Sequence, residues 1–430
     1  MKHRKMLVAV LLLLVGMTFS IAAAPQTPAT IKIGVLHSLS GTMAISETTL
    51  KDTILMMIED QNKKGGLLGK KLEAVVVDPA SNWPLFAEKA QQLLEKDKVA
   101  VVFGCWTSVS RKSVLPVFEK NNGLLFYPVQ YEGEESSKNV IYTGAAPNQQ
   151  AIPAVDYLMK DLAVKRWVLE GTDYVYPRTT NKILEAYLLS KGVAAADISI
   201  NYTPFGHSDW QTRVAAIKKF GSAGKKTAVV STINGDANVP FYKELGNQKV
   251  SAEDIPVVAF SVGEEELSGL DTKPLLGHLA AWNYFQSVKT PANTAFINQW
   301  HTYIKSNKRT TNDPMEAHYV GFNLWVKAVQ KAGTTDVEKV LAALPGLETP
   351  NLTGGVAKML ANHHITKPVY IGEVRADGQF DVVWKTTGTV PGDAWSDFLP
   401  GSKDIDADWV TLKCGNYNKT TKKCSGQNYK

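Results

Sequence analysis

Continuous runs of apolar residues recur along this chain, and amphipathic segments separate them. The first runs are IKIGVL, KLEAVVVD, VAVVFG and LLFYPV, at residues 31–36, 71–78, 99–104 and 124–129. Strands buried on both faces of a sheet give runs of this kind, because neither face meets water. Between the second and third runs, Phe86, Ala90, Leu93 and Leu94 recur at the spacing of one helical face. This alternation predicts an α/β fold of the doubly wound type.

The pattern stops at residues 142–150 and then starts again. The second series of runs is RWVLEG, ISINYT, KTAVVST and IPVVAFS, at residues 166–171, 198–203, 226–232 and 255–261. Residues 278–286 are expected to cross back, and a hairpin is expected around Asp377 and Gly378. A chain of this length is too long for one ordinary domain. We predict two Rossmann-like lobes joined by a multi-strand hinge, formed by residues 30–145 with 287–345 and by residues 146–286 with 346–400, before a tail at 401–430.

Residues 1–24 predict export. Lys2, Arg4 and Lys5 precede an apolar run at 6–21, and three alanines follow it. These are the three regions of a secretory signal peptide. A single membrane anchor is the alternative, which the shortness of the run and the lack of charge after it disfavour. Removing the segment takes three positive charges from a formal net charge of +6, and no basic block remains, so nucleic acid binding is not indicated.

The three cysteines divide into two and one. Cys414 and Cys424 bracket a short polar loop near the C-terminus. Disulfides persist in the compartment of an exported protein, but the sequence leaves open whether these two cysteines pair. Cys105 follows an apolar run and has no obvious partner. An inert buried thiol is favoured there over a catalytic thiolate.

Two neighbouring strands of the first lobe end in polar and aromatic residues. The run at 99–104 stops at Cys105, Trp106, Thr107 and Ser108, and the run at 124–126 stops at Tyr127 and a proline. Open α/β sheets bind their ligands at the carboxyl ends of the strands. A hydroxyl and flat aromatic faces at this edge predict a site for a small, polar, planar molecule.

The strand ends of the second lobe carry similar groups. Tyr174 and Tyr176 follow the first strand, and we favour a role for one of these side chains in lining the ligand site over a role in core packing alone. Asn234 and Asp236 follow a later strand within Asn-Gly-Asp, which also forms turns readily. Glu264 opens a run of three glutamates that either contacts the ligand or caps the next helix.

Signatures of catalysis are missing from the sequence. It contains no G-x-S-x-G elbow, no H-E-x-x-H and no Cys/His cluster with zinc spacing. His363 and His364 form an isolated pair in an expected loop. We therefore predict binding without catalysis, and neither a metal nor a cofactor is expected.

Six segments together resemble a known family, the type I periplasmic solute-binding proteins of ATP-driven transporters. They are GCWTSVSRKSVLPVFE, LLFYPVQYEGEE, YTGAAPNQQ, DYVYPR, STINGD and AAWNYFQS. Within the family the chain looks most like the urea-binding members, which are close to short-chain amide-binding proteins and more distant from branched-chain amino acid binders. The likeness covers essentially the whole chain after residue 24.

The resemblance implies a periplasmic, monomeric receptor whose two lobes close around a small neutral ligand and present it to the membrane permease of an ABC importer. Ser108 matches the hydroxyl that holds the carbonyl end of the ligand. Aromatic walls are matched by Trp106, Tyr127 and Tyr174, and the ligand set extends to Thr107, Tyr176 and Trp282. Val129 stands where amino acid binders typically place a threonine that helps to hold the α-carboxylate, so the resemblance implies an uncharged ligand.

Urea fits these expectations because it is planar and offers four N–H donors and one carbonyl acceptor. Asp236, Glu132 and Glu264 are the candidate acceptors for its amide nitrogens. The same fold binding short-chain amides or branched-chain amino acids is the nearest rival function. Two more distant rivals are a cytoplasmic ligand-sensing regulator, which the predicted signal peptide opposes, and a secreted hydrolase using Cys105, which the missing motifs oppose.

Overall fold

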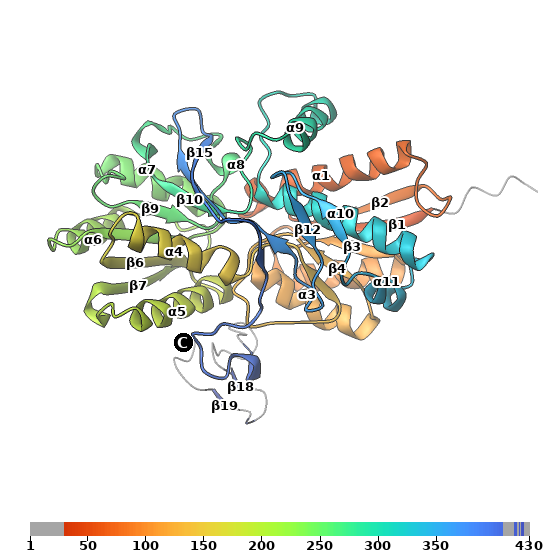
Figure 1. The fold of residues 1–430 in the computed structure, drawn as a ribbon, viewed down its shortest axis with the longest axis horizontal. Helices are drawn as coiled ribbons and strands as arrows, with labels where there is room; N and C mark the ends of the chain where they lie inside the picture. The colour runs from red at the N-terminus through yellow and green to blue at the C-terminus, as the bar shows by residue number, and fades with distance from the viewer. Residues whose placement is uncertain (1–29, 407–416, 419–420, 422, 425–430) are drawn as a thin grey trace, which may run out of the picture.

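Two α/β lobes lie side by side in the computed structural model, which describes residues 30–406, 417–418, 421 and 423–424 (Figure 1). The predicted doubly wound, two-lobed α/β fold is confirmed. The signal peptide and Cys414 lie outside the described residues. Among the described residues, no helix has both the length and the apolar character needed to span a membrane.

The first lobe is built on a parallel five-stranded sheet. Its strands, from one edge to the other, are β2 (Leu72–Val77), β1 (Ile31–Leu36), β3 (Val101–Gly104), β4 (Leu125–Tyr127) and β5 (Val140–Tyr142). The helices of this lobe are α1 (Ala44–Lys63), α2 (Trp83–Gln91), α3 (Ser108–Asn121), α9 (Pro291–Ile304), α10 (Asp313–Ala332) and α11 (Val337–Ala343). The strand order reverses between β1 and β3, where doubly wound sheets bind ligands.

The second lobe has a seven-stranded sheet in the order β15 (Phe380–Lys385), β14 (Tyr370–Val374), β10 (Leu279–Trp282), β9 (Val257–Ala259), β8 (Thr227–Thr232), β6 (Arg166–Thr172) and β7 (Ile198–Thr203). Its helices are α4 (Ala151–Lys160), α5 (Val175–Ser190), α6 (Gln211–Gly221), α7 (Asn238–Asn247) and α8 (Glu264–Leu267). The five strands from β10 to β7 are parallel, and the order β7-β6-β8-β9-β10 repeats that of the first sheet. The predicted hairpin is the antiparallel pair β14–β15.

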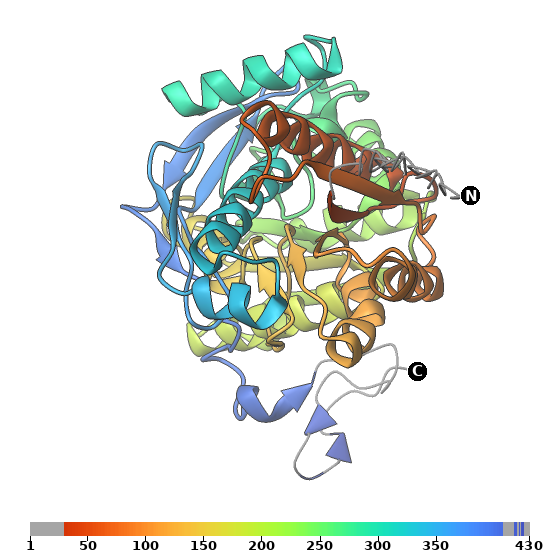
Figure 2. The same cartoon turned by 90° about the vertical axis from the view of Figure 1, so that its right-hand side faces the viewer.

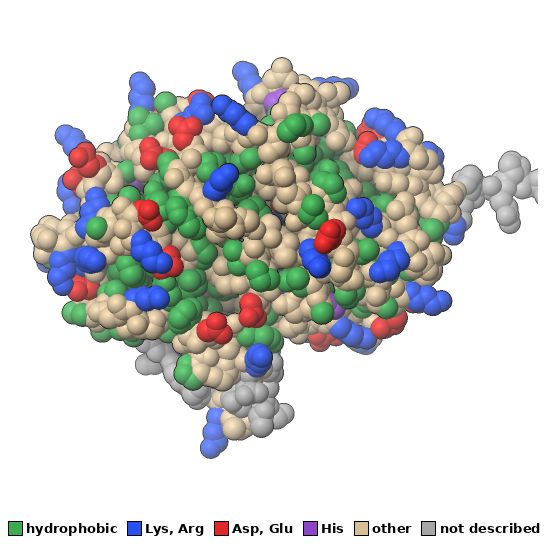
Figure 3. All heavy atoms as spheres, viewed as in Figure 1, with side chains coloured by type: hydrophobic (Ala, Val, Ile, Leu, Met, Phe, Trp, Pro, Cys, Tyr) green, Lys and Arg blue, Asp and Glu red, His purple; other side chains and the backbone are tan. Residues whose placement is uncertain are grey.

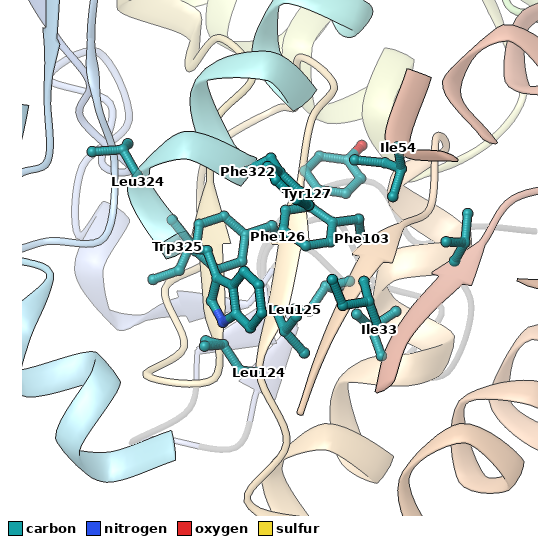
Figure 4. Close-up of a cluster of buried hydrophobic side chains, with 14 of the residues drawn as sticks. Ile33, Ile54, Phe103, Leu124, Leu125, Phe126, Tyr127, Phe322, Leu324 and Trp325 are labelled. Carbon is teal, nitrogen blue, oxygen red and sulfur yellow. The ribbon is translucent and has the colours of Figure 1, made fainter. Parts of the chain in front are cut away.

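Segments from the second half of the sequence complete the first lobe. Helix α10 packs beside α1, as Figure 2 shows. Phe103 of β3 stacks on Phe126 of β4 with ring centroids 5.1 Å apart, and Phe322 and Trp325 of α10 cover both strands (Figure 4). Burying these large rings against the sheet stabilises the lobe and fixes the strand ends that carry the site.

The chain passes between the lobes several times. After α11, the short pair β11 (Glu348–Pro350) and β12 (Val356–Lys358) adds to the core of the first lobe, and β14 and β15 then return to the second. Further short strands are β13 (Thr366–Lys367), β16 (Val390–Pro391), β17 (Ile405–Asp406), β18 (Tyr417–Asn418) and β19 (Lys423–Cys424). The residue boundaries predicted for the lobes stay a prediction.

Charged side chains are dispersed on the face drawn in Figure 3, where Lys and Arg stand among hydrophobic and neutral groups rather than in one block. This agrees with the even spread of charge along the sequence.

Candidate functional site

Loops from the carboxyl ends of both sheets meet at the junction between the lobes. Trp106, which follows β3, donates its indole N–H to Oδ1 of Asn234, which follows β8, at 3.3 Å. Gln130, which follows β4, donates from Nε2 to Oγ of Ser261, which follows β9, at 2.7 Å. These residues come from opposite sheets, so their hydrogen bonds join the two lobes at the strand ends that the sequence indicates.

Helix α3 delivers a serine to this junction. Thr107 caps the helix by accepting a hydrogen bond from the Ser110 N–H at 3.1 Å, a common role for a threonine before a first turn. Ser108 is therefore held at the first helical position. Its hydroxyl donates to Oε2 of Glu132 and accepts from Nη1 of Arg111 at 3.2 Å.

Arg111 is the buried cation of the site. Its Nε donates to Glu135 at 2.7 Å and its Nη2 to Glu132 at 3.2 Å. Two aromatic rings also contact the guanidinium, since the centroids of Tyr127 and Tyr131 each lie 4.7 Å from its central carbon. Arg111 therefore fixes the positions of Ser108 and Glu132, with few of its own groups left to bind a ligand.

Charge at this centre is balanced. Lys112 adds a second cation at 2.8 Å from Glu135, so two cations face the two carboxylates of Glu132 and Glu135. Burial opposes the charged form of Glu135, but the charges of Arg111 and Lys112 hold the pKa of its carboxyl well below its usual range. The cluster of these four charged residues therefore carries no net charge.

Aromatic side chains surround the same point. Tyr127 is buried and donates its hydroxyl to the carbonyl of Trp106 at 2.5 Å. Tyr174 and Tyr176 of the second lobe are also buried, with ring centroids 6.2 Å apart, and they cluster with Val109 of α3. The structure thus brings the predicted residues Trp106, Ser108, Tyr127, Glu132, Tyr174, Tyr176 and Asn234 to one junction, and Val129 is buried on the loop beside them.

Three other predicted ligand residues make no hydrogen bond to Ser108 in the described structure. The side chain of Asp236 is exposed. Glu264 accepts from the backbone N–H of Gln286 at 2.7 Å, and burial raises the pKa of its carboxyl to about 8. Trp282 packs in the core of the second lobe and donates to the Val262 carbonyl at 2.8 Å. Their assignment to the ligand site stays a prediction, as does that of Thr107, whose hydroxyl caps α3.

The sequence alone did not reveal Arg111, Gln130, Trp83 and Phe205. Arg111 lies three residues after Ser108, a spacing that places both side chains on one face of a helix. This spacing is the sequence feature that could have indicated Arg111. The ring centroid of Phe205 lies 4.7 Å from that of Tyr174 and 5.3 Å from that of Trp83 on α2. These contacts join distant segments of the chain, so no local sequence pattern reveals them. Among the described residues, no group of His, Cys, Asp and Glu is arranged to hold a metal ion.

Comparison with known proteins gives one consistent family. Residues 31–401 match the family described as periplasmic binding protein domain. The Leu/Ile/Val-binding protein BraC3 of Rhizobium johnstonii is 25% identical over 350 residues, which cover 78% of this chain and 89% of BraC3. A limonene hydroxylase of Geobacillus stearothermophilus is 30% identical over 122 residues, but these cover only 28% of this chain and 22% of the hydroxylase.

Solved structures show the same fold. A solute-binding protein of an ABC transporter from Rhodopseudomonas palustris HaA2, in complex with p-hydroxybenzoic acid, superposes with a TM-score of 0.72 at 21% identity, covering 85% of this chain and 99% of the other. The branched-chain amino acid binding protein LivJ of Streptococcus pneumoniae, in complex with isoleucine, gives a TM-score of 0.69 at 19% identity over 84% of this chain and all of LivJ.

Proposed function

The chain belongs to the periplasmic binding protein family, and we propose that it is the urea receptor of an ABC importer, capturing urea between its two lobes. Family membership supports a location outside the cytoplasm, a small-molecule ligand and delivery to a membrane permease. It also supports binding without catalysis, since the limonene hydroxylase match spans too little of either chain to suggest a reaction. A monomeric state stays a prediction.

The observation that carries the choice of ligand is the balanced charge around Arg111. Its guanidinium donates to Glu132, Glu135 and Ser108 and contacts the rings of two tyrosines. A carboxylate-bearing ligand needs a cation or several N–H donors that are not already engaged. The Arg111 guanidinium does not supply them, and Val129 places no hydroxyl in the loop, so a neutral ligand is favoured.

A rotation of one hydroxyl would admit urea. The Ser108 hydroxyl now donates to Oε2 of Glu132. If it turns to donate to the urea carbonyl, Oε2 of Glu132 becomes available to accept a urea N–H. The number of hydrogen bonds at the site rises while its charge stays the same, which suits a ligand with one acceptor and four donors.

The affinity has a ceiling set by size. Urea has four heavy atoms, and at most about 1.5 kcal/mol per atom gives about 6 kcal/mol, or a Kd of tens of micromolar. Binding much tighter than this would require every N–H to be satisfied and the lobes to close at little cost.

The second candidate function is a receptor for branched-chain amino acids, which the names of several relatives suggest. BraC3 is named a Leu/Ile/Val-binding protein and the Brucella relatives are named homologues of one, and they align over most of this chain at 24–25% identity. A leucine-type ligand is a zwitterion, so it would need a partner for its carboxylate other than the engaged Arg111. A receptor for short-chain amides differs less from the urea proposal, since those ligands share the carbonyl and one amide group.

Calorimetric titration of the mature protein with urea, acetamide and leucine tests the proposal. We expect a one-to-one urea isotherm, weaker acetamide and no heat with leucine; a leucine response with silent urea would overturn it. Ser108→Ala should weaken urea binding about tenfold, the loss of one well-placed hydrogen bond. Ser110→Ala is the matched control, because its hydroxyl donates to the Thr107 carbonyl within the helix turn. Assay of ammonia in the same samples tests for hydrolysis.

A further inference from the structure

Gln130 occupies a special place in the junction. It lies on the loop after β4 of the first lobe, its side chain is 4% exposed, and its Nε2 donates to Ser261 of the second lobe at 2.7 Å. Because the amide group of glutamine is planar, this bond fixes the direction of the other amide atom, Oε1.

Two buried polar atoms at this point make no hydrogen bond of ordinary geometry within the described part of the chain. One is Oε1 of Gln130 and the other is the hydroxyl of Tyr176, which is 3% exposed. Burial raises the pKa of Tyr176, while the adjacent Gln130 and Ser261 side chains act in the opposite direction, so the hydroxyl stays protonated next to them. A buried polar atom that no protein group satisfies calls for a partner of another kind.

The chemistry of these two atoms selects the partner. A carbonyl oxygen only accepts hydrogen bonds, and a tyrosine hydroxyl both accepts and donates. An N–H₂ group satisfies both, since it can donate one hydrogen to each oxygen. A carboxylate oxygen would instead face the carbonyl oxygen of Gln130, which is repulsive.

We propose that Gln130 recognises an N–H group of the ligand through Oε1, together with the Tyr176 hydroxyl, while its Nε2 holds the second lobe at Ser261. One side chain then links recognition of an amide to closure of the lobes. The inference rests on the proposed function, because it assigns the second amide group of urea to this point. It also explains a glutamine rather than a glutamate, because a carboxylate would add charge and could not donate to Ser261.

Three variants separate the two halves of this role. Gln130→Met keeps the volume but removes both polar atoms, Tyr176→Phe removes only the ligand-facing hydroxyl, and Ser261→Ala removes only the partner in the second lobe. Gln150→Met is the control for losing a buried glutamine, because Gln150 bonds to the Phe260 and Ala281 carbonyls within the second lobe. Thermal melting checks that each variant is folded.

Urea affinity is measured by calorimetry and lobe closure by the ligand-induced fall in radius of gyration in small-angle X-ray scattering. We expect Gln130→Met to lose at least tenfold in affinity and most of the compaction. Tyr176→Phe should lose severalfold in affinity with compaction retained at saturation, and Ser261→Ala should lose compaction first. If folded Gln130→Met binds within twofold of the wild type, or if Tyr176→Phe and Ser261→Ala change neither quantity, the inference is overturned.

Failure of the proposed function looks different. If wild-type protein is silent with urea and acetamide but binds leucine, the urea proposal fails. The same variants titrated with leucine then decide the role of Gln130, since unchanged leucine binding in Gln130→Met removes it from the site.

Discussion

Gly235 lies where the second lobe touches the first, and a side chain there should hold the lobes apart. It follows β8 with φ +69°, and a Cβ built on it would lie 2.7 Å from the Thr42 carbonyl oxygen and 2.9 Å from Sδ of Met43. Thr42 and Met43 precede α1 of the first lobe, and the next N–H, of Asp236, already bonds to the Thr42 carbonyl at 3.2 Å. Gly235→Ala therefore requires the two backbones to separate.

The size of the effect follows from these distances. Ordinary contact begins near 3.4 Å, so the carbonyl must retreat by roughly 0.7 Å, which stretches the Asp236–Thr42 bond and the 3.3 Å Trp106–Asn234 bond beyond useful length. Two lost bonds at about 1 kcal/mol each weaken the closed state by about 2 kcal/mol, or about 30-fold in apparent Kd. Alanine at positive φ costs about 1 kcal/mol more in fold stability, but that cost is present whether the lobes are open or closed.

Gly224→Ala provides the matched control. Gly224 belongs to the same lobe at φ +77°, and a Cβ there meets no atom within 4 Å. Both variants should lose similar stability in chemical denaturation, whereas only Gly235→Ala should lose urea affinity in calorimetry and ligand-induced compaction in small-angle scattering. Equal affinities for the two variants would refute the reasoning that the lobes meet at Gly235 in the ligand-bound state.

Three further outcomes are expected. Arg111→Met should lower the free energy of unfolding by about 3–5 kcal/mol, because it leaves the buried carboxylate of Glu132 without a cation and that of Glu135 with Lys112 alone; denaturant curves within about 1 kcal/mol of the wild type would contradict this. Trp106→Ala should favour larger amides over urea in calorimetric ranking, and an unchanged order would remove Trp106 from the pocket. Because the folded-state pKa of Glu264 is raised to about 8, the folded protein holds a proton that the unfolded chain releases above about pH 4.3, so stability should fall as the pH rises through this window. Glu264→Gln should flatten that slope in melts between about pH 5 and 8, and a slope equal to the wild type would place the titration elsewhere.

The fold was predictable because the central strands of both sheets are buried on both faces, although β2, β7 and β15 are partly exposed. β1, β7 and β14–β15 were located directly by apolar runs or turn residues, and the reversal of strand order follows from the doubly wound pattern. Strand β5, only three residues long, was missed because Val140–Tyr142 is too short to form a recognisable run.

Only those site residues that directly follow a strand could be predicted from the sequence. Trp106 and Ser108 follow β3, and position alone indicates a role for them. The pairing of Trp106 with Asn234 depends on how the two lobes dock. The two residues are 128 positions apart, and no local sequence pattern indicates that they meet. The glutamates after Gly263 show the same limit. Glu266 caps α8 by accepting from the Gly263 N–H at 2.9 Å, and it also accepts from the Ser46 hydroxyl of the first lobe at 2.6 Å. Glu264 instead accepts from the backbone N–H of Gln286.

Contacts between the lobes and contacts to the ligand should have separable effects on selectivity. Side-chain hydrogen bonds join the lobes directly, among them Trp106–Asn234, Gln130–Ser261 and Ser46–Glu266. At about 1 kcal/mol each, these three contribute about 3 kcal/mol to closure, a large share beside the roughly 6 kcal/mol that a four-atom ligand can supply. A change that acts on closure alone, such as Gly235→Ala, should therefore scale the affinity of urea and acetamide by one common factor, since both need the same closed state. A change at Gln130 should alter their ratio, because urea offers a second amide group where acetamide has a methyl.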